Sequence, residues 1–499
     1  MEIKLNGGSI AYLKTIFDTT VVQEETCELS VADNMPDILR IAQATSVVTV
    51  KNKAADTGRV TVNGSVALCV MYCPEGADGL RRVTADLPFT CTYSDGQIGP
   101  ETNLSVSCRV ISADASFTTS RKCVARVILS TALTGYEPDT IYAGREFACD
   151  DTELELQTEE YSVTLPVTLT EKSLVLSDEH DLPQPGDGEL LGYSVHAAAE
   201  DYKIVGNKVV IRGQASYKAL LRTPAGVEDL SYNKEFSQIL ELDEIQPEDQ
   251  FRVTFMLTGT YAHIAPGLTG ESGKVVSEIQ LAAQCLQRRS MTIVSVKDAY
   301  GIGCRLEPEK QTYSLPCQEQ LLEKTELFVQ TIETPEPVKR VLNTQASCAA
   351  VSQEGGGLRT TLYISVLYLD QAEKIQSLAR MFEVTSVLED AAAEKMTLQA
   401  LVPEVYAAAG GGGVDIRASV RFQAITEKMV SVESVTGGEL MAEAGQERRS
   451  LVLRRVMPGE DLWQIAKQYM GRRETILAVN GLEKQEIVPG SMLLVPVGR

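Results

Sequence analysis

The residue types that most often carry out chemistry are few and scattered in this sequence. Its three histidines are His180, His196 and His263, and seven of its eleven cysteines lie in the first 150 residues without a CxxC pair. A zinc site needs closely spaced Cys or His ligands, and a nucleophile needs a base beside it. Neither pattern is present, so we expect no metal site. The cysteines are typical of small buried side chains in a reducing compartment.

Two glycine-containing stretches resemble ligand-binding loops but lack the required pattern. In "GLTGESGKVV" (267–276), five residues separate Gly267 from Gly273 where a phosphate-binding loop has four, and Val275 replaces the required Ser or Thr. The run "AAAGGGGVD" (407–415) favours a flexible hairpin connection. Adjacent acids such as Glu159-Glu160 do not place two carboxylates across a substrate. We predict no catalytic residue, no cofactor and no enzymatic activity.

Length and charge limit the classes of protein to consider. At 499 residues the chain is expected to form about three or four domains. Its net charge of -22 disfavours nucleic acid and anionic membrane surfaces as partners. Residues 450–499 carry 7 Lys/Arg against 5 Asp/Glu, so this tail is +2 and the remainder is -24. The tail can therefore contact an acidic partner or the acidic body of its own chain.

The first 25 residues lack the basic start, apolar segment and cleavage site of a signal peptide. No run of about 18 apolar residues, as a membrane-spanning helix requires, occurs in the sequence. We expect a cytoplasmic protein.

A strand pattern recurs three times at domain-sized intervals. It reads "RVTVNGSVALCVMY" (59–72), "KVVIRGQASYKALL" (208–221) and "LRTTLYISVLYLD" (358–370). With Gly64, Gly213 and Thr360 in register, the spacings are 149 and 147 residues. An apolar-aromatic segment and two long alternating strands follow each copy, as in antiparallel β-structure. We predict a mainly β fold.

The strand pattern divides the chain into four expected domains. Three tandem β-rich domains span 1–150, 151–303 and 304–440, and a small α+β domain spans 448–499. The polar segment 436–450 lacks an apolar period and is expected to be a tether that lets the tail move against the body.

The tail has the pattern strand, helix, helix, strand. A strand at 452–456 is followed by the turn Pro458-Gly459, and Asp461 with Gln464 forms a capping box for the first helix. Ile476, Leu477 and Val479 are expected on the inner face of the second helix. That helix ends at Asn480-Gly481, and the strand "MLLVPV" returns.

These elements resemble the LysM domain family in order and spacing. The resemblance implies binding of N-acetylglucosamine polymers through two adjacent loops. The residues that it assigns to binding are Pro458, Gly459, Glu460, Asp461, Leu462, Asn480, Gly481, Ile487 and Pro489. Glu460-Asp461 replaces a common Asp-Thr, and Arg473 replaces a commonly apolar residue. Trp463 could stack on a sugar, but its helical spacing favours a position in the core.

The repeats, the segment "MPDILRI" (35–41) and the strand "VNGSVALCVMY" (62–72) resemble the SPOCS-domain family of clostridial spore-coat morphogenetic proteins. The resemblance implies a scaffold in the mother-cell cytoplasm that is recruited to the forespore surface. Its LysM domain would bind the ATPase of the coat basement layer. A peptidoglycan-binding protein is the alternative, and an unrecognised wall hydrolase is a weaker one.

Overall fold

The chain is described by a computed structural model that covers residues 4–497 except 7, 144–145, 149–151, 183–187, 225, 267–272, 355–356, 389–394, 442–449 and 484–485. Antiparallel strands dominate these residues, and the two helices lie in the tail. The mainly β prediction is confirmed. Neither described helix has the length and apolar character needed to cross a bilayer.

The same strand arrangement occurs three times. The first copy has β2 (Ser9–Ser30), β3 (Ile38–Asp56), β4 (Arg59–Pro74), β5 (Arg81–Ser94), β6 (Asn103–Thr119) and β7 (Lys122–Tyr142). The second has β9 (Leu154–Asp181), β10 (Glu189–Val205), β11 (Lys208–Thr223), β12 (Gly226–Glu241), β13 (Gln250–Ala265) and β14 (Lys274–Gly301). The third has β15 (Arg305–Glu333), β16 (Val338–Cys348), β17 (Ser352–Glu354), β18 (Gly357–Asp370), β19 (Ile375–Ser386), β20 (Lys395–Gly410) and β21 (Gly413–Met441).

Each copy forms two antiparallel sheets. Its first strand pairs with its last, which also pairs with the strand before it, as in β2-β7-β6 and β9-β14-β13. The inner strands form the second sheet, as in β3-β4-β5 and β10-β11-β12. These pairings lie within residues 9–142, 154–301 and 305–441, while β1 (Lys4–Asn6) pairs with β8 (Glu146–Ala148). On this basis we propose the three copies as domains with the boundaries expected from the sequence.

The glycines that set the repeat register have a packing role. Gly213 pairs with Phe236 across β11 and β12, and a Cβ on Gly213 would lie 2.5 Å from the Phe236 ring. At the equivalent place in the third copy, Thr360 pairs with Val384. A larger residue on one strand therefore accompanies a smaller one on its neighbour, which conserves the filled volume.

A shared apolar cluster joins the three copies, and we call it the three-repeat junction. Its central residues Met71, Leu220 and Leu367 occupy the same repeat position and are buried. The other buried members are Ala42, Cys73, Leu80, Leu191, Val227, Leu342 and Ile375. Because all three copies contribute apolar area to one cluster, each is expected to stabilise the others.

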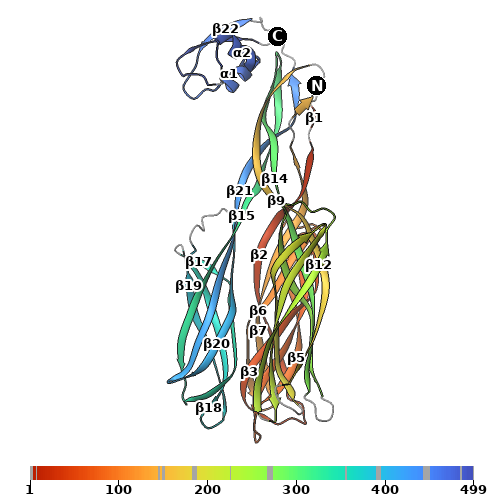
Figure 1. Ribbon diagram of the computed structural model, residues 1–499, viewed down its shortest axis with the longest axis vertical. Helices are drawn as coiled ribbons and strands as arrows, with labels where there is room; N and C mark the ends of the chain where they lie inside the picture. Colours follow the sequence, from red (N-terminus) through yellow and green to blue (C-terminus); the bar gives the residue numbers. More distant parts are fainter. Residues whose placement is uncertain are drawn as a thin grey trace.

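The long first and last strands of the copies continue together beyond the paired sheets, and we call this extension the stalk. Figure 1 shows β9, β14, β15 and β21 rising from the body towards the tail. Tyr12, Tyr161 and Tyr313, one from each copy, pack in one buried cluster.

The strands of the second and third copies break near the expected boundary at 303/304, because β14 ends at Gly301 and β15 begins at Arg305. The segment 436–450, expected to be a tether, differs in its first part, because β21 extends to Met441. Residues 442–449 of that segment lie outside the described residues. The segment 407–415 forms the expected hairpin turn, whereas most of the glycine loop 267–276 lies outside the description.

The ten cysteines in the described ranges carry free thiols. Burial raises the pKa of Cys69 to about 11 and that of Cys285 to about 12, so both are protonated near neutral pH. Five of the ten are buried, as expected, namely Cys73, Cys91, Cys123, Cys285 and Cys348, and the other five are partly exposed.

Candidate functional site

The tail folds as the expected βααβ unit. It contains β22 (Leu451–Arg455), α1 (Leu462–Gln468), α2 (Arg473–Asn480) and β23 (Met492–Pro496). Asp461 accepts a hydrogen bond from the Gln464 backbone N–H at 2.7 Å, and the Gln464 side chain accepts one from the Asp461 N–H. This confirms the capping box. Gly481 ends α2 with a φ of 65°, the left-handed conformation that glycine adopts without a steric penalty.

Backbone bonds at one end of the β22–β23 sheet bring the two predicted binding loops together. The Val456 N–H donates to Ser491 O at 2.9 Å, and the Gly490 N–H donates to Val456 O at 2.8 Å. The loop after β22 (457–461) therefore starts beside the turn that precedes β23. Asn480 fixes the start of the second loop to β23, because its side chain donates to Leu494 O at 2.6 Å and accepts from the Leu494 N–H at 2.8 Å.

The nine predicted binding residues occupy different environments. Pro458, Gly459, Gly481 and Pro489 are exposed on the loops and remain predicted contact residues. Asp461 is exposed but its carboxylate caps α1. The other side chains serve the domain itself: Asn480 bonds to β23, and Ile487 packs against the tail core.

Leu462 is buried in the tail core, so its prediction as a contact residue is wrong. It is the first residue of α1, and its side chain packs in the cluster that holds Val456, Leu493 and Val495.

Glu460 is partly exposed on the first loop and remains a predicted contact residue, but its carboxylate is already engaged inside the domain. Its carboxylate accepts bonds from the Arg454 guanidinium at 2.6 and 2.7 Å and from the Met457 N–H at 2.9 Å. The Met457 N–H, with help from Arg454, holds the pKa of Glu460 below its ordinary value. Glu460 therefore fixes the shape of the first loop.

Two apolar residues on the loops were missed. Met457 is 55% exposed and Val488 is 69% exposed, one on each of the adjacent loops. Apolar side chains are usually assigned to the interior from sequence, and their positions next to two Pro-Gly turns were the available signal. Val479 is the opposite case, because it was expected on the inner face of α2 and is half exposed.

The polar connection was expected to let the tail move against the body. Instead, the tail docks on the end of the stalk (Figure 1). Asp298 of β14 accepts a bond from the Trp463 indole at 2.8 Å and two from the Lys467 ammonium at 2.6 and 2.7 Å. Lys310 lies 3.0 Å from the same carboxylate. Burial alone would raise the pKa of Asp298, but bonds from Lys467, Trp463 and Lys310 outweigh burial and lower it.

Aromatic packing accompanies this ion pair. The Tyr300 ring of β14 lies edge-on to the Trp463 ring with centroids 4.9 Å apart, and its hydroxyl donates to Gly471 O at 2.8 Å. The Gly303 N–H donates to Met470 O at 3.0 Å. Tyr300 belongs to the same buried cluster as the tail core. The tail is therefore packed against the stalk as well as paired with it.

Arg473, which departs from the apolar residue common in the LysM family, takes part in the docking. Its guanidinium bonds to Glu155 at 2.7 Å and lies 4.8 Å over the Trp463 ring. The neighbouring Arg472 pairs with Glu153. Trp463 is 7% exposed, which confirms its position in the core, and its indole N–H also bonds across to the stalk.

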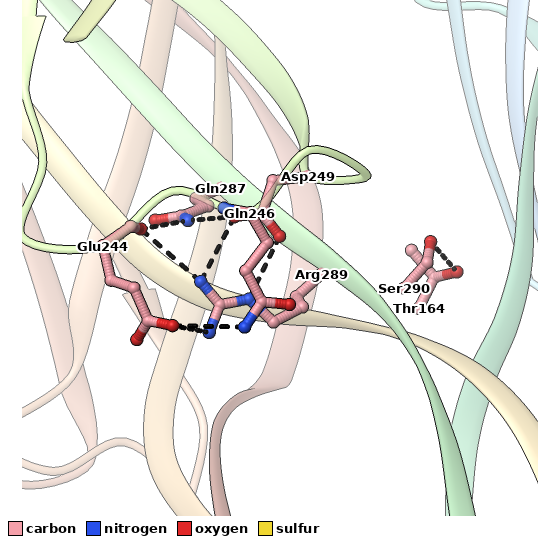
Figure 2. Close-up of polar contacts among 7 residues, drawn as sticks. All are labelled: Thr164, Glu244, Gln246, Asp249, Gln287, Arg289 and Ser290. Atoms are coloured by element: carbon pink, nitrogen blue, oxygen red, sulfur yellow. Dashed lines mark hydrogen bonds and ion pairs between the residues drawn. The ribbon is translucent and has the colours of Figure 1, made fainter. Parts of the chain in front are cut away.

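A polar cluster on the second copy is a weaker candidate for a site. Figure 2 shows Arg289 between Asp249 and Glu244, with Gln287 bonded to Asp249 at 2.7 Å. A pocket of about 380 Å³ lies beside this cluster. Burial raises the pKa of Asp249, but Arg289 and the neighbouring amides outweigh it and lower the pKa. The cluster satisfies its own charges and fastens the loop 242–249 to β14.

The described residues place no group of three or more His, Cys, Asp or Glu side chains where a metal ion could be held.

Comparison with known families identifies two segments. The family described as "SipL, SPOCS domain" matches residues 37–118, which span β3 to β6 of the first copy. The family described as "LysM domain" matches residues 455–496. Both resemblances seen in the sequence are thus confirmed, and the two segments belong to families of binding domains rather than of enzymes. No curated protein and no solved structure matches the chain.

Proposed function

We propose that this chain, which contains a SPOCS domain of the SipL family and a LysM domain, is a non-enzymatic scaffold of the spore coat. Its LysM domain would bind the ATPase of the coat basement layer, and the chain would act in the mother-cell cytoplasm at the forespore surface. The observation that carries the proposal is the presence of both domains in one chain.

The exposed loop residues support a protein as the partner. Met457 and Val488 add apolar surface to the loops that also carry Pro458 and Pro489. Exposed apolar side chains at the centre of a contact are typical of protein interfaces. The Glu460–Arg454 pair holds the first loop in place, which lowers the entropy lost on binding.

Binding of peptidoglycan or another N-acetylglucosamine polymer is the second candidate, because the matched LysM family is one of carbohydrate-binding domains. The two adjacent loops would then hold a sugar chain. Trp463 is not available for stacking on that sugar, because it is buried and packs against Tyr300 and Arg473.

The deciding experiment is a retention assay with the full chain as bait, offered purified peptidoglycan in one arm and lysate of sporulating cells in the other. The full chain is needed because Trp463 and Arg473 have partners on the stalk. Retention of one dominant coat ATPase that is lost in a Met457→Glu/Val488→Glu variant, without sedimentation on peptidoglycan, is the expected result. Sedimentation on peptidoglycan alone would overturn the scaffold proposal in favour of glycan binding.

A matched control adds the same charge to the same domain as the Met457→Glu/Val488→Glu variant does. Leu451→Glu combined with Leu453→Glu adds the same two charges at exposed positions of β22 in the same LysM domain, away from the two loops. It should retain the ATPase as well as the parent chain does.

A further inference from the structure

The stalk carries, at its end, a surface of opposite charge to the face of the LysM domain that it meets. We call this surface the stalk tip and define it by Glu153, Glu155, Asp298, Tyr300 and Gly303. Its three carboxylates face Lys467, Arg472 and Arg473. The net charges of the two parts are also opposite, because the tail is +2 and the remainder of the chain is -24.

The contacts also fix an orientation. The indole N–H of Trp463 reaches Asp298, the Tyr300 hydroxyl reaches Gly471 O, and the Arg473 guanidinium reaches Glu155. These three points lie on α1, on the turn after it and on α2. Because hydrogen bonds are directional, any rotation of a rigid domain held at three separate places would break at least one of these bonds.

The docking and the predicted binding loops use different parts of the LysM domain. Hydrogen bonds and ion pairs to the stalk come from the segment 463–473. The polar contacts of the loops stay inside the domain, as in Glu460 with Arg454 and Arg455 with Gly490. Pro458 and Pro489 remain exposed in the docked state.

From this geometry we propose that the stalk tip is a receptor that holds the LysM domain in one orientation. The contacts hold the domain without the covalent connection, and they persist while the binding loops are occupied. The inference rests on the proposed function only in taking the loops as the binding site. The LysM domain is then a fixed end piece of the scaffold, and a partner bound to the loops is placed at a set position relative to the body.

The test separates docking from tethering. A site for a specific protease is introduced between residues 442 and 449 of the full chain, the chain is cleaved, and the products are run on a gel-filtration column. The LysM fragment is expected to elute with the body. Asp298→Arg and Glu155→Arg place a cation against Lys467 and Arg473, and more than half of the fragment should then elute separately.

Two further variants guard the interpretation. Glu160→Arg changes an exposed acid on the same strand β9 and should leave the fragment with the body. Glu155→Arg combined with Arg473→Glu restores an opposite-charge pair and should recover part of the co-elution, which a variant that had merely misfolded would not do. Separation of the fragment from the unaltered body, or its retention by the Asp298→Arg body, would overturn the receptor role.

A last arm tests docking with the loops occupied. The cleaved, co-eluting complex is mixed with whichever probe the retention assay has shown to bind, the purified coat ATPase or an N-acetylglucosamine oligomer. The fragment and the body should both remain with that probe. Release of the fragment on binding would contradict the fixed orientation. If neither probe binds in the retention assay, the proposed function is overturned, and the co-elution test of the receptor role is unaffected.

Discussion

The three-repeat junction and the stalk tip both join separate parts of the chain, but they do so by different physics. The junction is an apolar cluster around Met71, Leu220 and Leu367. The tip combines one aromatic contact with carboxylates, an ammonium and guanidinium groups. Apolar burial responds little to pH and weakly to salt, whereas ion pairs respond to both. The difference indicates a permanent body and an end piece whose hold depends on charge.

The largest effect is expected at the junction. Leu367 is 0% exposed, and Leu367→Asp would bury a charge without a partner, which should lower the free energy of unfolding by about 4 kcal/mol or more. Denaturant unfolding followed by circular dichroism measures the change. Leu327→Asp, at a position 69% exposed in the same copy, should stay within about 0.5 kcal/mol of the parent. Equal losses for the two variants would disprove the distinction.

Trp463→Ala is the next largest change, because it removes a core side chain and its contacts with the stalk. The LysM domain should lose about 3 to 5 kcal/mol of stability, while the body stays folded. Hydrogen exchange of the amides in residues 450–497 measures the loss. Exchange as slow as in the parent would show that Trp463 does not support this core.

Acid should loosen the tip before it affects the junction. The pKa of Asp298 is lowered from its ordinary 3.8 in the docked state, so its contribution is complete above that value and is lost as the pH falls through the lowered pKa. Lys467, Lys310 and the Trp463 indole face this carboxylate and bond to its charged form.

The fluorescence of Trp463, the single tryptophan of the chain, follows this transition. Emission from the full chain should be constant between about pH 7 and 5 and should change below about pH 4. Asp298→Asn keeps an oxygen for the indole but cannot ionise, so its emission should lack this change. A transition of the same size in the Asn variant would assign the titration to another group.

The smallest effect is expected from the outermost ion pair. Arg472 and Glu153 are each more than half exposed, and such pairs contribute about 0 to 1 kcal/mol. Glu153→Gln should therefore shift the co-elution of the cleaved LysM fragment only slightly, and raising the salt to about 0.5 M should abolish the difference from the parent. A loss of co-elution as large as that caused by Asp298→Arg would mean that charge alone holds the LysM domain on the stalk tip.

The sequence predicted what depends on local pattern. Alternating residues predicted the last four strands of each copy, and Asp461 with Gln464 predicted the helix cap, since both signals lie within a few residues. The first two strands of each copy were not predicted. The docking of Lys467 on Asp298 joins residues 169 positions apart, and no local pattern encodes it. The unusual Arg473 and the opposite charges of tail and body were the signals available beforehand.

The binding residues were harder to predict than the fold. Family position assigned Leu462 and Glu460 to the binding loops, but Leu462 is buried in the tail core and the Glu460 carboxylate is already bonded to Arg454. Which side of a short loop faces outwards depends on packing that a pattern of residue types does not contain.

The length of the stalk strands has a mechanical consequence. β9 and β14 have 28 residues each, which at about 3.3 Å per residue makes each strand roughly 90 Å long. A pull on the LysM domain along the stalk passes into β21, from which the chain continues into that domain, and would load the many β15–β21 hydrogen bonds in parallel, as shear, rather than open them one at a time. The protein can therefore act as a strut that keeps a bound partner at a fixed height above the body and transmits tension between them.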